Sequence, residues 1–189
     1  MYLFFDTETT GLPLNWKAPV TDLSNWPRLV QLAWLLYDNS GNLLSSANHI
    51  IKPEHFTIPF SASSIHGITQ ERACREGAPL ASILDEFTKS LSESETLIAH
   101  NMRFDEAIVG AEFLRKKMPN LLSSKVKICT MLNSTNLCRL DGPYGYKWPK
   151  LSELHYFLFQ SDFPEAHNAA VDIAVTAKCF WELKQRGII

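Results

Sequence analysis

Two apolar segments joined by a short polar turn constrain the fold more than any other feature of this sequence. Residues 29–37 are almost entirely apolar, residues 38–42 (Asp-Asn-Ser-Gly-Asn) are turn formers, and residues 43–51 follow as a second β-prone run. This order predicts a β-hairpin. An earlier apolar run at residues 2–5 ends at Asp6 and predicts a buried strand.

The rest of the chain alternates predicted helices with two short predicted strands. Apolar periodicity and helix-end signals predict helices at residues 61–68, 80–91, 101–118, 131–137, 151–159 and 168–185. Short runs at 96–99 and 126–129 predict strands. We therefore expect an α/β fold in a single domain over residues 1–189. Its mixed five-stranded sheet has an antiparallel hairpin, parallel strands and helices on both faces.

A long irregular segment separates the first strand from the hairpin. Residues 12–27 contain three prolines and two tryptophans. Connections in compact domains are usually much shorter, so this segment is either a functional loop or partly mobile.

Charge and composition exclude some classes of protein. The formal net charge of −2 argues against a histone-like protein that binds nucleic acid through many Lys and Arg contacts to phosphate. It does not exclude a nuclease, because a carboxylate-rich metal site lowers the net charge while the metal supplies a local positive field.

The cysteines and the apolar runs predict a cytoplasmic protein without membrane association. The four cysteines lack zinc-ligand spacing, which favours reduced thiols. No signal peptide is apparent, and no apolar stretch approaches the roughly 20 residues of a membrane span. No motif indicates an oligomeric state.

The first group of candidate functional residues is Asp6 and Glu8. Side chains two residues apart on a strand point to the same face, so these carboxylates should lie side by side at the strand end. Their repulsion is costly unless a cation lies between them. For this pair alone, a metal site and an exposed acidic strand end paired with a lysine explain the pattern about equally well.

The second candidate is Asp105. Asn101 is a good N-cap for the predicted helix, which places Asp105 in or just past its first turn, near the positive end of the helix dipole. A lone Asp at such a position is more often a helix-favouring acid than a catalytic group. Phe104 on the adjacent apolar face is expected to orient Asp105.

The third candidate pair is His167 and Asp172. Residues five apart on a helix are separated by about 140°, so both cannot face one site if both are helical. We place His167 in the loop before the helix and Asp172 on its second turn, with both turned toward the end of the sheet. Alone, this spacing is weak evidence, because His167 could be a helix-capping surface histidine.

Taken together, these motifs resemble a known family. Asp-Thr-Glu-Thr-Thr-Gly at 6–11, His-Asn-Met-Arg-Phe-Asp at 100–105 and the His167/Asp172 pair occur in the order of the DEDDh 3′–5′ exonucleases. That group includes the epsilon proofreading subunit of bacterial DNA polymerase III, ribonuclease T and oligoribonuclease. Ile-His-Gly-Ile-Thr at 65–69 is also similar to a family segment. The resemblance implies a ribonuclease H-like fold.

The resemblance also implies a two-metal-ion mechanism with Mg²⁺ or Mn²⁺, which hard oxygen ligands favour. Asp6 would bridge both ions, Glu8 and Asp172 would complete the shell of the ion that holds the attacking water, and Asp105 would hold the second ion directly or through water. His167 would be the general base. The implied reaction releases nucleoside 5′-monophosphates from the 3′ end of single-stranded nucleic acid. DNA is favoured over RNA as the substrate, but no motif in the sequence decides between them.

Substrate contacts are expected where the family's backbone meets the terminal nucleotide and an apolar side chain wedges against its base. The substrate-binding residues implied by the resemblance are Thr9, Thr10, Gly11, Leu12, His66, Asn101 and Phe104. Three tryptophans could stack on a base or pack within their own loops: Trp16, Trp26 and Trp148.

Two other functions remain open. A catalytically silent nucleic-acid-binding module could share the fold, and a nucleotide phosphoesterase could use the same ions on small substrates. The presence of all five metal and base positions favours the exonuclease. The chain ends shortly after the third motif, so a DNA polymerase partner is expected to need a docking surface other than the epsilon subunit's extra segment.

Overall fold

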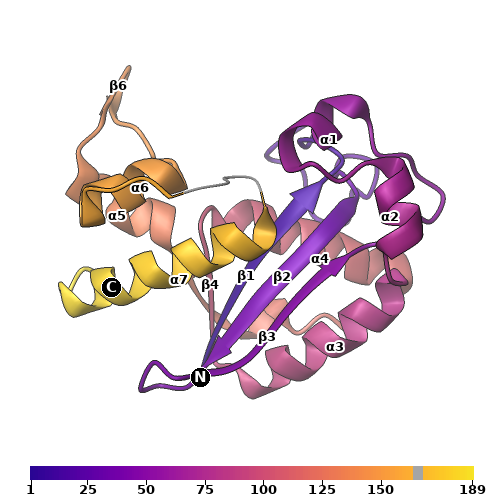
Figure 1. Cartoon of the computed structure of the whole chain (residues 1–189), viewed down its shortest axis with the longest axis horizontal. Helices are drawn as coiled ribbons and strands as arrows, with labels where there is room; N and C mark the ends of the chain where they lie inside the picture. The colour runs from indigo at the N-terminus through magenta and orange to yellow at the C-terminus, as the bar shows by residue number, and fades with distance from the viewer. Residues whose placement is uncertain (164–167) are drawn as a thin grey trace.

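The fold is a five-stranded mixed sheet between two layers of helices (Figure 1). The computed structural model describes residues 1–163 and 168–189. The sheet order is β3-β2-β1-β4-β5. The strands are β1 (Tyr2–Thr9), β2 (Leu29–Tyr37), β3 (Leu43–Ile50), β4 (Thr96–Ala99) and β5 (Val126–Cys129). β1 pairs antiparallel with β2 and parallel with β4, which confirms the predicted mixed sheet.

Alternation along β1 divides the core into two layers. Leu3 and Phe5 pack with α3 (Leu80–Glu93) and α4 (Met102–Lys116) on one face. Phe4 packs on the opposite face against α7 (Ala169–Gln185). Figure 1 shows α7 crossing its face of the sheet, with α5 (Thr130–Cys138) and α6 (Leu151–Phe159) stacked beyond it. The expectation of helices on both faces is confirmed.

The remaining elements lie at the edges of these layers. The short helices α1 (Phe60–His66) and α2 (Gln70–Glu76) follow the hairpin. Gly67 ends α1 in the left-handed conformation (φ 72°), as its sequence position predicts. The sequence did not predict α2, the 3-10 helix η1 (Leu122–Ser124), or the small hairpin of β6 (Asp141–Gly142) and β7 (Gly145–Tyr146). In the part of the chain that the structure describes, no helix has the length and apolarity to span a membrane.

The segment 12–27 is an ordered loop. The Asn25 amide accepts from the Asn15 N–H (2.6 Å) and donates to the Asn15 carbonyl (3.1 Å). The Trp26 indole is buried and donates to the Pro19 carbonyl (3.0 Å). Arg115 of α4 donates to two carbonyls of the loop. These contacts fix the loop against the C-terminal half of α4.

Candidate active site

The parallel pairing of β1 and β4 brings the first two acidic motifs to one edge of the sheet. Carboxyl ends of parallel strands meet at the same edge, where open α/β sheets place their ligands. β1 runs on past its pairing with β4, so Asp6 and Glu8 lie within the strand rather than after it. α4 begins just beyond β4 and carries Asp105 in its first turn. Asp105 therefore approaches the site from α4, on the face of the sheet that Leu3 and Phe5 cover.

The last helix supplies the third acidic side chain. The Asn168 side chain caps α7 by accepting from the Ala170 N–H (3.1 Å), and Gln31 of β2 accepts from the Ala169 N–H (3.3 Å). Asp172 therefore lies in the first turn of α7, not in the second turn that we expected, because the helix begins at Ala169. His167 lies outside the described residues.

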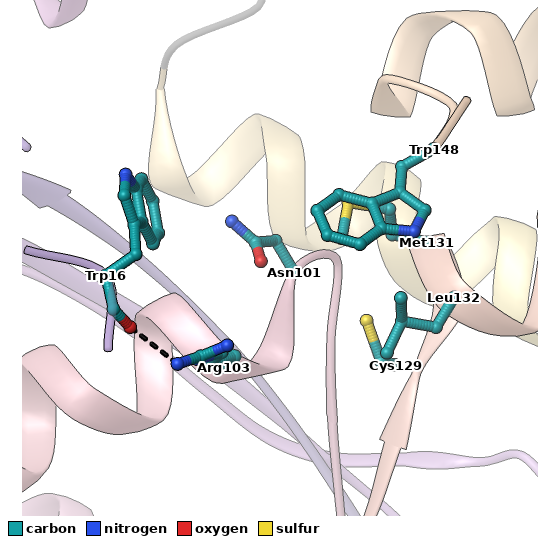
Figure 2. A pocket seen from close by; sticks show the side chains of 7 residues that line it. All are labelled: Trp16, Asn101, Arg103, Cys129, Met131, Leu132 and Trp148. Carbon is teal, nitrogen blue, oxygen red and sulfur yellow. Dashed lines mark hydrogen bonds between the residues drawn. The ribbon is translucent and has the colours of Figure 1, made fainter. Parts of the chain in front are cut away.

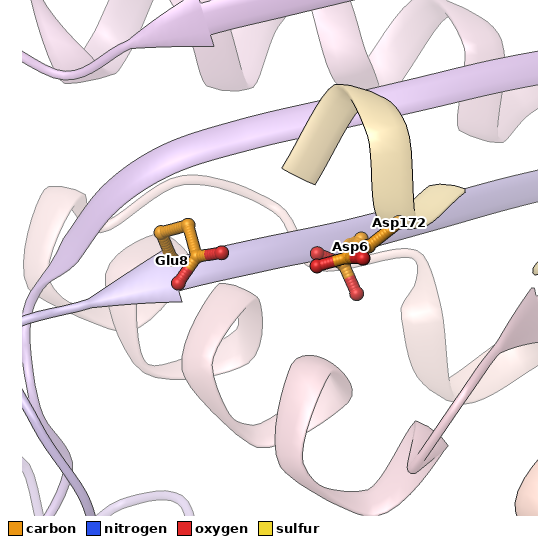
Figure 3. A group of neighbouring side chains, drawn as sticks. All are labelled: Asp6, Glu8 and Asp172. Carbon is orange, nitrogen blue, oxygen red and sulfur yellow. The ribbon is translucent and has the colours of Figure 1, made fainter. Parts of the chain in front are cut away.

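Three carboxylates converge across the gap between β1 and α7. One oxygen each from Asp6, Glu8 and Asp172 lies within 4.8 Å of the other two. Figure 3 shows Asp6 and Asp172 facing each other, with Glu8 farther along β1 toward its tip. Among residues 1–163 and 168–189, this is the only set of three Asp, Glu, His or Cys side chains so placed.

Burial and the charges of neighbouring acids raise the pKa values of three carboxyl groups at the site. Burial, then the charges of Asp105, Asp172 and Glu8, raise the pKa of Asp6 well above its ordinary value. Burial, then Asp172 and Asp105, raise the pKa of Glu8 to about 8. Burial raises the pKa of Asp105 to about 7, although a hydrogen bond from Thr7 opposes the rise. A divalent cation would relieve this repulsion, so the carboxylate-only donor set fits a hard ion such as Mg²⁺ or Mn²⁺.

Thr7 is a site residue that the sequence analysis missed. Its hydroxyl donates to Oδ1 of the buried Asp105 (2.7 Å). Thr7 points to the opposite face of β1 from Asp6 and Glu8, which is why it meets α4. Asp105 is therefore oriented by Thr7, whereas we had expected Phe104 to orient it.

Asn101 occupies the predicted N-cap position but does not act as a side-chain cap. Its backbone is left-handed (φ 80°), a conformation that Asn tolerates better than most residues, and its carbonyl accepts from the Phe104 N–H (2.8 Å). The predicted cap by the Asn101 side chain is wrong for this reason. The amide instead lines the neighbouring cavities.

A cavity of about 690 Å³, here called the acid groove, adjoins the carboxylates. Three of the expected substrate-binding residues line it: Leu12, Asn101 and Phe104. The groove also includes residues that sequence reasoning did not select, namely His100, Met131, Lys150 and Ser152. Trp16 and Trp148, which the sequence left open between stacking on a base and packing in their own loops, line it too.

The other expected substrate residues have local structural contacts. Thr9 donates to the Gly11 carbonyl (2.6 Å), and the Thr10 hydroxyl accepts from the Arg28 N–H (2.9 Å). These bonds shape the turn that carries Leu12 to the groove. His66 is buried at the end of α1, where its Nδ1 accepts from the backbone N–H two residues later (3.1 Å).

Sequence comparison gives matches over most of the chain. The RNase_T family model, described as Exonuclease, matches residues 3–180. The DNA polymerase III PolC-type proteins of Streptococcus sanguinis and Streptococcus mutans are 32% identical over 123 residues and 30% identical over 120 residues. Each match covers 64% of this chain but 7% of the relative's length, so the chain corresponds to a small part of those proteins.

Solved structures share the fold. E. coli Exonuclease I in complex with a dA16 oligonucleotide has a TM-score of 0.74 at 20% identity, over 97% of this chain and 40% of that chain. Exonuclease X in complex with 5′ overhanging duplex DNA has a TM-score of 0.66 at 21% identity, over 99% and 93%. These similarities confirm the ribonuclease H-like fold expected from the motifs. Since the family model spans nearly the whole chain, the chain belongs to the RNase_T exonuclease family, of the DEDD 3′–5′ type.

Proposed function

We propose that this protein is a metal-dependent 3′–5′ exonuclease that removes nucleoside 5′-monophosphates from single-stranded DNA in preference to RNA. The observation that carries the proposal is the convergence of Asp6, Glu8 and Asp172 within 4.8 Å beside the acid groove. A groove lined with apolar and aromatic side chains next to the carboxylates suits a strand whose unpaired bases can stack.

The carboxylates would hold two divalent cations, Mg²⁺ or Mn²⁺. Asp6 would contact both ions, Glu8 and Asp172 would complete one shell, and Asp105 would hold the second ion directly or through water. Bound there, such ions activate water and stabilise the leaving oxygen of a phosphodiester. In this assignment the four carboxylates would hold the ions, and the Thr7 hydroxyl keeps the Asp105 carboxylate in one orientation.

We assign the general base to His167. The support is its sequence position, five residues before Asp172 and directly before the Asn168 cap of α7. An imidazole with an ordinary pKa near 6.5 can accept the proton of an attacking water near neutral pH. Leu12, Phe104 and Asn101 of the groove would contact the terminal nucleotide, with Thr9, Thr10 and Gly11 shaping the turn that carries Leu12. His66 is a further candidate substrate contact.

The preference for DNA rests on relatives rather than on a contact. Solved Exonuclease I structures hold dA16 or dT13 oligonucleotides, and the matching sequence relatives are DNA polymerases of the PolC type. The same relatives make a DNA polymerase a candidate partner, in which case this chain would correct or trim a strand for another enzyme.

The test uses 5′-labelled single-stranded DNA and RNA of the same sequence with Mg²⁺ or Mn²⁺. We expect a ladder that shortens from the 3′ end, faster on DNA, and that a chelator abolishes. Asp6→Asn and His167→Ala should each lose most of the activity. Asp85→Asn, which changes an exposed acid on α3, should keep it.

Other outcomes would replace the proposal. Strand binding without shortening under all metal conditions would indicate a catalytically silent module. Hydrolysis of a small nucleotide ester with intact oligonucleotides would indicate a phosphoesterase. An undiminished ladder from Asp6→Asn would contradict the mechanism.

A further inference from the structure

A second cavity, here called the tryptophan pocket, opens beside the acid groove. It has a volume of about 530 Å³ and is lined mainly by apolar side chains. Figure 2 shows Trp16 and Trp148 on opposite sides of the pocket, with Asn101 between them. The remaining lining residues include Arg103, Met131 and Leu132.

Trp16 is exposed but held in place. Its side chain is 42% exposed, although tryptophan is a costly residue to leave in water. The Arg103 guanidinium donates to the Trp16 carbonyl (2.5 Å), and the indole lies against Phe104 with ring centroids 5.7 Å apart. Phe104 lines the acid groove, so these two rings form a continuous aromatic wall from the groove to the pocket.

Trp148 faces this wall from a loop that is also anchored. Its side chain is 64% exposed. The backbone on its two sides is fixed, because Lys147 N–H donates to the Leu140 carbonyl (2.8 Å) and Nε2 of His100 lies 3.0 Å from the Pro149 carbonyl. A carbonyl can only accept, so His100 donates there. Burial lowers the pKa of His100 to about 4, so the ring is neutral at ordinary pH.

The exposure of these two tryptophans contrasts with that of others in the chain. Trp26 and Trp34 are 4% and 1% exposed, and each indole N–H donates to a protein oxygen. Trp26 packs into the buried core, whereas Trp16 of the same loop is exposed. The two exposed indoles therefore present flat apolar faces that the core does not use.

The pocket and the acid groove form one continuous surface. Four residues line both cavities: Trp16, Asn101, Met131 and Trp148. A single nucleic acid strand could therefore place one base in the tryptophan pocket while its backbone reaches the carboxylates of the acid groove. A nucleobase has flat faces that stack on indoles and a polar edge that an amide or a guanidinium can hydrogen-bond, and Asn101 and Arg103 supply these groups.

We propose that the tryptophan pocket is a stacking subsite for a nucleobase next to the cleaved bond, with Trp16 and Trp148 as its aromatic walls. The proposal rests on the function assigned above, since it takes the occupant to be the processed strand. Stacking on an aromatic side chain contributes ~1–3 kcal/mol per base and tolerates any sequence. The subsite would thus strengthen binding of single strands whatever their sequence.

The test measures binding, so that it does not depend on catalysis. A fluorescein-labelled short oligothymidylate is titrated with the wild-type protein, Trp16→Ala and Trp148→Ala in Ca²⁺, and the Kd is read from anisotropy. We expect each substitution to weaken binding roughly 5- to 150-fold, the equivalent of one lost stack. Trp148→Phe should keep most of the affinity. Mn²⁺ affinity should not change, because neither tryptophan touches the carboxylate cluster.

A matched control and an abasic probe make the result specific. Tyr144, a fully exposed aromatic residue four positions before Trp148, lies at the tip of the β6–β7 hairpin, and Tyr144→Ala should leave the Kd unchanged. Removing the base at one nucleotide beside the cleaved bond should weaken wild-type binding and add no further loss to Trp148→Ala.

The pocket assignment is overturned if both tryptophan variants bind normally, if Tyr144→Ala binds as weakly as they do, or if the abasic and protein changes add independently. If both tryptophan variants bind the strand normally, the pocket would instead be a candidate site for a protein partner. Failure of the proposed function looks different: the strand binds with the expected dependence on the tryptophans but is not shortened when Mg²⁺ or Mn²⁺ is added.

Discussion

Replacing Asp6 by Asn should stabilise the metal-free protein at alkaline pH. Asp6 has a raised pKa because it is buried among Asp105, Asp172 and Glu8. A carboxyl group whose pKa is higher in the folded state binds a proton more tightly there than in the unfolded chain. Its ionisation therefore costs stability as the pH rises from the unfolded pKa near 4 through the folded pKa. Asn keeps the shape of the side chain and removes this cost.

The size of the effect follows from the spacing of the oxygens. Two full charges at the 4.8 Å limit of the cluster repel by about 3.5 kcal/mol at an effective dielectric constant of about 20. The actual repulsion is smaller than this figure near pH 7, because the raised pKa values of Asp6 and Glu8 keep part of the cluster protonated and neutral. We expect Asp6→Asn to raise the metal-free free energy of unfolding by roughly 1–3 kcal/mol at pH 9 and by much less at pH 5.

Thermal unfolding in chelator across this pH range measures the effect. A domain of this size should gain about 2–4 °C in Tm for each kcal/mol. Saturating Mn²⁺ should reverse the order of stability, because under the proposed function the wild-type protein would bind the ion with one more ligand than the variant. Asp38→Asn is a control of opposite sign, since hydrogen bonds from Asn42 and Ser40 lower the pKa of Asp38 and its charge is favourable. An Asp6→Asn protein no more stable than wild type at pH 9 would refute the electrostatic reasoning.

Three further results are expected. Mn²⁺ affinity measured by calorimetry should rise from about pH 6 to pH 8.5, because the ion must displace protons from Glu8 and Asp105, whose pKa values are about 8 and 7; a flat profile would contradict this. Thr7→Val should shift the acid limb of the pH–rate profile to higher pH by roughly one pH unit, or ~1.4 kcal/mol, because the Thr7 hydrogen bond lowers the pKa of Asp105. Thr7→Ser should keep the wild-type profile, and a Thr7→Val profile that coincides with that of the wild type would argue against the role of this hydrogen bond. Glu112→Gln should lose roughly 3–5 kcal/mol in urea unfolding, because this fully buried carboxylate pairs with Arg28 (2.8 Å) and Arg115 (3.0 Å) and the variant leaves both partly buried guanidinium charges without a counter-charge; an unchanged midpoint would show that the ion pairs are dispensable.

Local patterns in the sequence were enough to predict the sheet and the approximate positions of three acids. Period-two alternation along β1 puts Asp6 and Glu8 on one face, and the turn at 38–42 determines the hairpin. The helix-start signals before α7 placed Asp172 near its N-terminus to within one turn. These features depend on neighbours within a few residues, which is the range over which sequence periodicity is informative.

Features that depend on distant packing could not be read in advance. The Thr7–Asp105 hydrogen bond joins residues 98 positions apart, and nothing local marks Thr7 as its donor. The Asn101 side chain lost its predicted capping role to a left-handed backbone that the strand-to-helix junction imposes. Trp16 and Trp148 face each other only because their two loops meet at the end of α4.

The acid cluster draws on the two ends of the fold: Asp6 and Glu8 come from β1, and Asp172 comes from α7. A nascent chain can thus pair its hairpin and build most of its sheet before it holds a complete set of ligands. Under the proposed function, the ion site would be complete only after α7 has docked on β1 and β2. Under the proposed function, detaching α7 from β1 and β2 would therefore remove a metal ligand and expose one apolar face of the sheet in a single step.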